Sequence, residues 1–177
     1  MVLGAGFFTS QTAQATVHTG VQQASSSMEL VGNIYGVADG TLAHLKYVNV
    51  TIALTAGGTP IDLSQMVVSY SDNHQGYNAN VKGGNGGTDL FFCDNAIAGG
   101  AGAAQEWCIG SKINSVTGTA TTGAMLDNNA QMVIIVGVPT TADPNTKISI
   151  NFQPAVGAVL PITRTVPGGL TVVQPLY

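Results

Sequence analysis

Two hydrophobic patterns divide the chain near residue 27. Before it, apolar and weakly polar residues recur at spacings of three and four, as on one face of a helix: Leu3, Phe7, Ser10, Gln14, Val17, Val21, Ala24 and Met28. The pattern predicts an α-helix over residues 1–27. Its face becomes more polar toward the middle, and such a helix is marginal alone in water. We expect it to pack against other helices, or alternatively to lie as an amphipathic helix on its own domain.

After residue 27, apolar and polar residues alternate with a period of two, the signature of half-buried strands. The clearest strand is 45–54, whose polar face carries Tyr47, Asn49 and Thr51. Further strands are predicted at 29–37, 65–70, 89–93, 106–109, 132–138, 148–152 and 170–176. Turn residues separate these runs, and long loops are predicted at 73–88 and 110–123. The region 28–177 is therefore predicted to be a mostly β domain of antiparallel strands, a sandwich or a barrel.

Composition narrows the choice of partners. Only 8% of residues are charged, against about 25% in an ordinary soluble domain. A surface of Ser, Thr, Asn, Gln and Gly suits packing against further copies, because few charges lose their hydration at contacts. It also suits a secreted β-domain with a plain polar surface. The five cations are scattered, which argues against nucleic-acid binding.

Cys93 and Cys108 are the two cysteines of the chain. Their spacing fits neither a CxxC redox motif nor a four-ligand zinc site. We expect a disulfide if the protein is exported and two buried thiols if it is not. A disulfide would fasten the Gly- and Ala-rich stretch 99–104.

The start of the chain is apolar but lacks the basic region and cleavage site of a secretory signal. The apolar run 2–8 is far shorter than the roughly 20 residues that span a bilayer. We expect the sequence to begin inside a longer apolar helix.

Candidate chemistry is sparse. His18, His44 and His74 are isolated, and no Gly-x-Ser-x-Gly elbow occurs, so the sequence does not predict an enzyme. Asp94 and Asp127, each followed by Asn, are candidate ligands for a structural calcium ion, with ordinary turn residues as the alternative. Asn49-Val50-Thr51 is a glycosylation sequon on the predicted polar strand face, which makes Asn49 a candidate glycan site.

Three segments then follow one another in a distinctive order. The first is the apolar run 2–8, which leads into the Gln-, Ala-, Ser- and Thr-rich stretch 9–27. The second is strand 45–54, followed by a Gly-containing turn, Ile61-Asp62-Leu63 and a strand that ends near Asp72. The third is strand 132–138, together with the closing run 164–169. Together they resemble the archaeal flagellins, or archaellins, over nearly the whole chain.

The resemblance implies a type IV pilin-like plan, with an N-terminal α-helix stalk and an immunoglobulin-like antiparallel β-sandwich. Residues 1–27 would be the C-terminal part of the filament-core helix, and 28–177 the outer domain. The polymerisation face would carry Leu3, Phe7, Val17, Val21 and Met28. The implied role is that of an extracellular structural subunit of the archaellum, forming a helical homo-oligomeric filament with other archaellin paralogues for swimming and adhesion.

The same resemblance bears on modifications and assembly. Family members are often N-glycosylated, which carries over to Asn49, and some bind a metal ion, but their acid-rich metal loop is not matched here. Without the first part of the apolar helix, we expect this chain to be a monomer or weak oligomer. The alternatives are an adhesion-pilus protein with the same plan and a secreted β-sandwich carbohydrate-binding protein.

Overall fold

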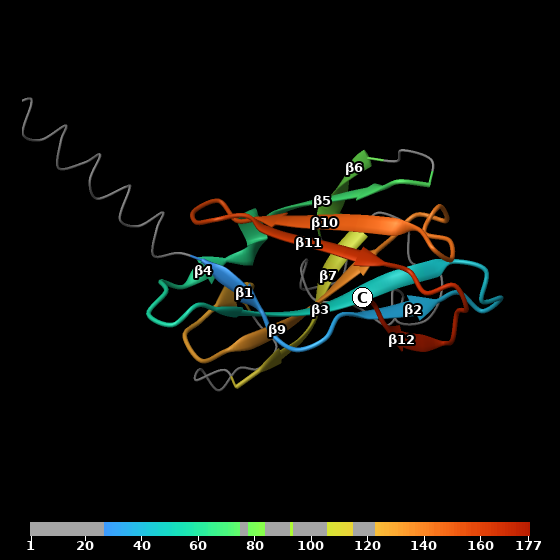
Figure 1. Cartoon of the computed structure of the whole chain (residues 1–177). Helices are drawn as coiled ribbons and strands as arrows, with labels where there is room; N and C mark the ends of the chain where they lie inside the picture. The colour runs from blue at the N-terminus through green and yellow to red at the C-terminus, as the bar shows by residue number, and fades with distance from the viewer. Residues whose placement is uncertain (1–26, 75–77, 84–92, 94–105, 115–122) are drawn as a thin grey trace, which may run out of the picture.

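A computed structural model describes residues 27–74, 78–83, 93, 106–114 and 123–177 (Figure 1). The helix predicted over 1–27, with Leu3, Phe7, Val17 and Val21, lies outside these residues, as does Asp94. Within the described part of the chain, no helix is long and apolar enough to cross a membrane.

The described residues form twelve strands and one short 3-10 helix. They are β1 (Met28–Leu30), β2 (Tyr35–Ala38), β3 (Leu45–Leu54), β4 (Ile61–Asp62), η1 (Leu63–Gln65), β5 (Val67–Asp72), β6 (Asn78–Gly83), β7 (Glu106–Ile113), β8 (Met125–Leu126), β9 (Gln131–Gly137), β10 (Lys147–Gln153), β11 (Leu160–Thr165) and β12 (Val173–Pro175). This confirms a mostly β fold with largely antiparallel pairing.

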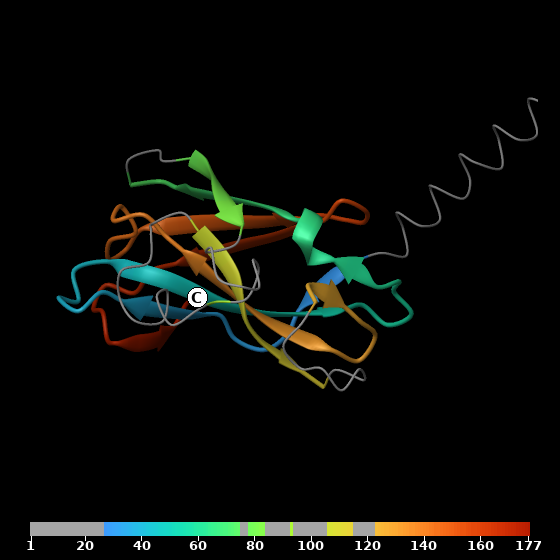
Figure 2. The same ribbon diagram turned by 180° about the vertical axis from the view of Figure 1, so that it is seen from behind.

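Hydrogen bonds connect ten of these strands in the order β11-β10-β5-β6-β7-β9-β3-β2-β12, with β1 beside β3. The path bends so that β5, β10 and β11 form one layer over β2, β3 and β9, as the two opposite views show (Figures 1 and 2). β4 and β8 form a separate two-stranded sheet.

One pair departs from the antiparallel prediction, because β6 and β7 run parallel, with Lys82 opposite Glu106. A parallel pair cannot be closed by a two-residue turn and needs a long connection. Residues 84–105 provide that length.

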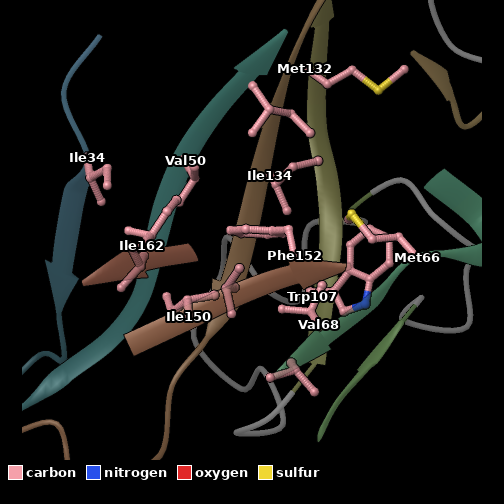
Figure 3. Packing of buried hydrophobic residues seen from close by; sticks show 14 of the residues in the cluster. Ile34, Val50, Met66, Val68, Trp107, Met132, Ile134, Ile150, Phe152 and Ile162 are labelled. Carbon is pink, nitrogen blue, oxygen red and sulfur yellow. The ribbon is translucent and has the colours of Figure 1, made fainter. Parts of the chain in front are cut away.

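The hydrophobic core lies between the two layers (Figure 3). Phe152 and Ile150 of β10 and Val68 of β5 come from one layer, and Val50 of β3 and Ile134 of β9 come from the other. Each strand contributes every second residue, which is the period expected of a sheet with one buried face. The bounds of β3 coincide with the predicted strand 45–54.

Four local predictions were wrong or incomplete. Met28, assigned to the end of the helix, is buried in β1 opposite Leu54. The alternating strand pattern therefore starts at Met28, one residue earlier than the predicted strand 29–37. The predicted strand 29–37 is broken at Gly32, which has a φ of 71°. The predicted loop 73–88 contains β6, and the predicted loop 110–123 begins with the last residues of β7.

Candidate functional site

The first described residue marks one end of the sandwich, which we call the basal end. The backbone N–H of Thr55 donates to the carbonyl of Ser27 at 3.0 Å, and the two side-chain hydroxyls lie 2.7 Å apart. Thr55 directly follows the end of β3. The described part of the chain therefore begins where β3 ends, beside β4 (Figure 1).

A hollow of about 350 Å³, which we call the basal hollow, lies at this end. Its walls are residues 59–62, Met125 and residues 155–156. β4 and β8 pair across one side, with Ile61 opposite Leu126 and Asp62 opposite Met125. The turn between β10 and β11 supplies Val156. Sequence reasoning missed the hollow because three segments far apart along the chain build it.

The rim of the hollow is apolar and open to solvent. Met125 is 42% exposed and Val156 is 51% exposed, while Ile61 is buried below them. The one charged wall residue, Asp62, caps η1 by accepting a hydrogen bond from the N–H of Ser64 at 2.9 Å. Exposed apolar side chains gathered at a hollow are typical of a contact surface.

The disulfide between Cys93 and Cys108 is present, which decides between the two alternatives that the sequence left open. Cys108 is fully buried in β7, and the N–H of Cys93 donates to the carbonyl of Ile109 at 2.9 Å. The bond therefore attaches residue 93 to the middle of the sheet.

Asn49, the candidate glycan site, lies in the middle of β3 between Tyr35 of β2 and Ile135 of β9. Its side chain is half-buried. Its Oδ1 atom is buried and has no hydrogen-bond partner among the described residues. Asn49 is thus on the polar strand face as predicted, but in a paired central strand rather than a surface loop.

Asp127, one of the two calcium candidates, forms an ion pair. The Nζ of Lys112 lies 2.9 Å from its Oδ2 and also donates to the carbonyl of Met125 at 2.6 Å. The Lys112 side chain is only 8% exposed, so its charge is satisfied by these oxygens. The ammonium group thus neutralises the charge of Asp127 through one of its two carboxylate oxygens. In the described ranges, no group of three or more His, Cys, Asp or Glu side chains could hold a metal ion.

A buried carboxylate that the sequence analysis did not single out connects β5 to the loop before β10. Asp72 accepts hydrogen bonds from the hydroxyls of Tyr70 at 3.1 Å and Thr141 at 2.5 Å, and from the N–H of His74 at 3.1 Å. The alternation that turns Val68 and Tyr70 inward also turns Asp72 inward. This alternation was the signal in the sequence that could have identified Asp72 as a buried carboxylate. The Nε2 atom of the His74 imidazole lies 3.5 Å from a carboxylate oxygen of Asp143.

A second acid organises the turn between β2 and β3. The Asp39 carboxylate accepts hydrogen bonds from the Thr41 hydroxyl and from the N–H groups of Thr41, Ala43 and His44. These donors, the Thr41 hydroxyl first, hold the pKa of Asp39 well below its usual range. The arrangement fixes a turn.

The comparisons with known proteins agree on one family. Residues 1–164 match the family of archaeal-type flagellin. The probable flagellin 1 of Archaeoglobus fulgidus is 52% identical over 69 residues, which cover 39% of this chain and 34% of that protein. The probable flagellin 2 of the same organism is 28% identical, with 97% of this chain and 80% of that protein covered.

Two solved structures share the fold. The archaeal flagellum of Methanospirillum hungatei strain JF1 matches with a TM-score of 0.66 at 21% identity, covering 98% of this chain and 84% of that one. Archaeal flagellin FlaB1 from Methanocaldococcus jannaschii matches with a TM-score of 0.66 at 20% identity, covering 84% of this chain and 95% of that one. Since the family match extends over most of the chain, from residue 1 to residue 164 in β11, this protein belongs to the archaeal-type flagellin family.

Proposed function

We propose that this protein is a structural subunit of an extracellular archaeal flagellar filament and serves swimming motility. The observation that carries the proposal is the family match over residues 1–164, which includes both the N-terminal segment and the sandwich. The fold shared with the flagellum of Methanospirillum hungatei supports it. The protein acts through assembly rather than through catalysis.

The proposed division of labour follows the two hydrophobic patterns. Residues 1–27 serve as the C-terminal part of a filament-core helix, and residues 28–177 serve as an immunoglobulin-like outer domain. The partners are further copies of this chain, together with paralogous flagellins. A role in surface adhesion is compatible with the same filament.

A carbohydrate-binding role is disfavoured by one observation. Trp107 is the single tryptophan of the chain and is 1% exposed, packed in the core (Figure 3). It therefore cannot serve as an aromatic platform for a sugar ring.

The test is assembly of the full-length mature protein, viewed by cryo-electron microscopy. The proposal expects helical filaments in which residues 1–27 run in a central helix bundle and the sandwich faces outward. Molecules that stay monomeric, with residues 1–27 folded back along the sandwich, would contradict it. A strain that lacks the gene is then expected to lose swimming, whereas loss of attachment alone would favour an adhesion pilus.

A further inference from the structure

We propose that the basal hollow is the docking site for the uncharged N-terminal segment of a neighbouring copy of this chain. The inference rests on the proposed function and adds to it a specific contact between the outer domain and the core segment. Its site is the wall formed by β4, β8 and the turn between β10 and β11.

The hollow has the chemistry of an apolar receptor. Val156 and Met125 are about half exposed on its rim. Asp62 is engaged in capping η1, and no cation lines the hollow. A second hollow of about 240 Å³ at the same end is lined by Glu29, Asn128 and Asn129, and is therefore more polar.

The shape of the hollow is fixed before any partner arrives. β4 and β8 pair across one side of it, and both Ile61 and Leu126 are buried in the core cluster. The Asp62 cap holds the start of η1, and Ile61 and Leu63 are anchored on either side of it. A preformed apolar site loses little conformational freedom on binding, which favours association.

The chain itself supplies a matching occupant. Residues 1–26 contain no Asp, Glu, Lys or Arg, and they include Leu3, Phe7 and Phe8. Such a segment enters an apolar hollow without the cost of removing charges from water. Ser27, to which this segment is covalently attached, lies at the basal end.

The occupant belongs to a second copy rather than to the same chain. If the helix predicted over 1–27 continues from Ser27, Phe7 lies twenty positions away, roughly 30 Å along the helix axis. A straight helix therefore carries its own apolar residues away from its own hollow. In a filament, the segment of an adjacent copy passes the hollow instead.

Two matched variants of the full-length protein test the site. Val156→Asp places a charge on the rim of the hollow. Val172→Asp places the same charge on a 67% exposed valine at the opposite end of the sandwich. The carbonyl of Val172 accepts a hydrogen bond from the N–H of Ala38, and Ala38 pairs with Leu45 at the start of β3. Both positions are exposed, so both variants are expected to keep the melting temperature of the unmodified protein.

We expect Val156→Asp to reduce the mass of pelletable filament at least tenfold and Val172→Asp to leave it unchanged. Normal assembly of Val156→Asp overturns the docking site, as does a loss of assembly in Val172→Asp alone. If the unmodified protein makes no filaments, the proposed function fails, and the inference fails with it. Filaments of the unmodified protein that tolerate Val156→Asp leave the function standing and remove only the inference.

A photo-crosslink identifies the occupant and does not depend on the aspartate variant. A benzophenone amino acid replaces Val156, and chains labelled with ¹⁵N are assembled with unlabelled chains. No Lys or Arg occurs between residues 1 and 45, so trypsin leaves residues 1–46 together in one peptide. Mixed-isotope crosslinks that fragment-ion spectra place within residues 1–26 support the inference. Crosslinks within one chain, or to peptides of the sandwich, overturn it.

Discussion

The hydroxyl of Thr141 donates a hydrogen bond of 2.5 Å to the carboxylate of Asp72, joining two residues that are 69 positions apart. Asp72 ends β5, and Thr141 lies in the loop that leads from β9 into β10. β5 and β10 are neighbours in the sheet, with Asp72 opposite Ile148. The bond therefore fastens the loop to β5, the neighbour of the strand β10 into which the loop leads.

Replacing Thr141 tests this connection. Thr141→Val leaves the 8% exposed Asp72 carboxylate with one donor fewer, which we expect to lower the free energy of unfolding by about 1–3 kcal/mol. Urea unfolding followed by fluorescence measures the change. Thr140→Val, at the exposed neighbouring threonine, is the control and is expected to be near neutral. Equal stability of the two variants would show that Asp72 does not depend on Thr141.

The turn after β2 gives the protein a component of stability that depends on pH. The pKa of Asp39 is lowered in the folded state, chiefly by the Thr41 hydroxyl and then by backbone N–H groups. A lowered folded pKa stabilises the fold above the unfolded pKa of about 4, and this contribution is lost as the pH falls below that value.

Asp39→Asn is therefore expected to melt at a lower temperature than the unmodified protein at pH 7. The difference is expected to shrink as the pH falls from 4 toward 2, because the unmodified carboxylate becomes protonated in the unfolded state and then in the folded state. Melting curves at pH 7, 5, 3 and 2 measure it. A difference that stays constant over this range would assign the effect to turn shape rather than to charge.

The disulfide is expected to stabilise the fold. Its partners are 15 positions apart, and a closed loop of this length contributes about 3 kcal/mol by restricting the unfolded chain. Replacing both cysteines by alanine should lower the free energy of unfolding by that order. A reductant should have the same effect on the unmodified protein and no effect on the variant. A melting temperature that does not respond to the reductant would contradict the prediction.

Uninterrupted alternation explains which strands could be predicted from the sequence. β3 alternates over ten residues and was bounded correctly, and β9 and β10 were each bounded within one residue. β4 and β8 have two residues each, too few for a period to be visible. β11 contains Pro161 and pairs on one side only, as expected for a proline-containing edge strand.

The candidate site was less accessible to sequence reasoning, because its parts meet only in the fold. The cysteine pair could be recognised, since two cysteines allow one intramolecular pairing. The ion pair between Lys112 and Asp127 forms only because Lys112 of β7 lies close to β8 and the residue that follows it. No local sequence pattern indicates that these two segments lie side by side. The basal hollow likewise depends on the β10–β11 turn lying beside β4.

Asn49 gives the last prediction, which concerns the order of folding and glycosylation. Its amide oxygen is buried without a hydrogen-bond partner in the described structure, and β2 and β9 flank its strand. We expect a glycan to reach Asn49 only before β3 pairs with its neighbours. An oligosaccharyltransferase should therefore modify a peptide of residues 45–55 but not the folded protein, as intact-mass measurement would report. Equal modification of both would contradict this order.

Two substitutions separate the glycan from the amide itself. Asn49→Val removes both the sequon and the unpaired amide, whereas Thr51→Val removes the sequon and keeps the amide. For protein made without a transferase, we expect Asn49→Val to raise the free energy of unfolding by about 1 kcal/mol, since an unpaired buried polar group is lost. Thr51→Val should not give this gain. A loss of stability in Asn49→Val would contradict this expectation and would mean that the amide oxygen has a hydrogen-bond partner in solution.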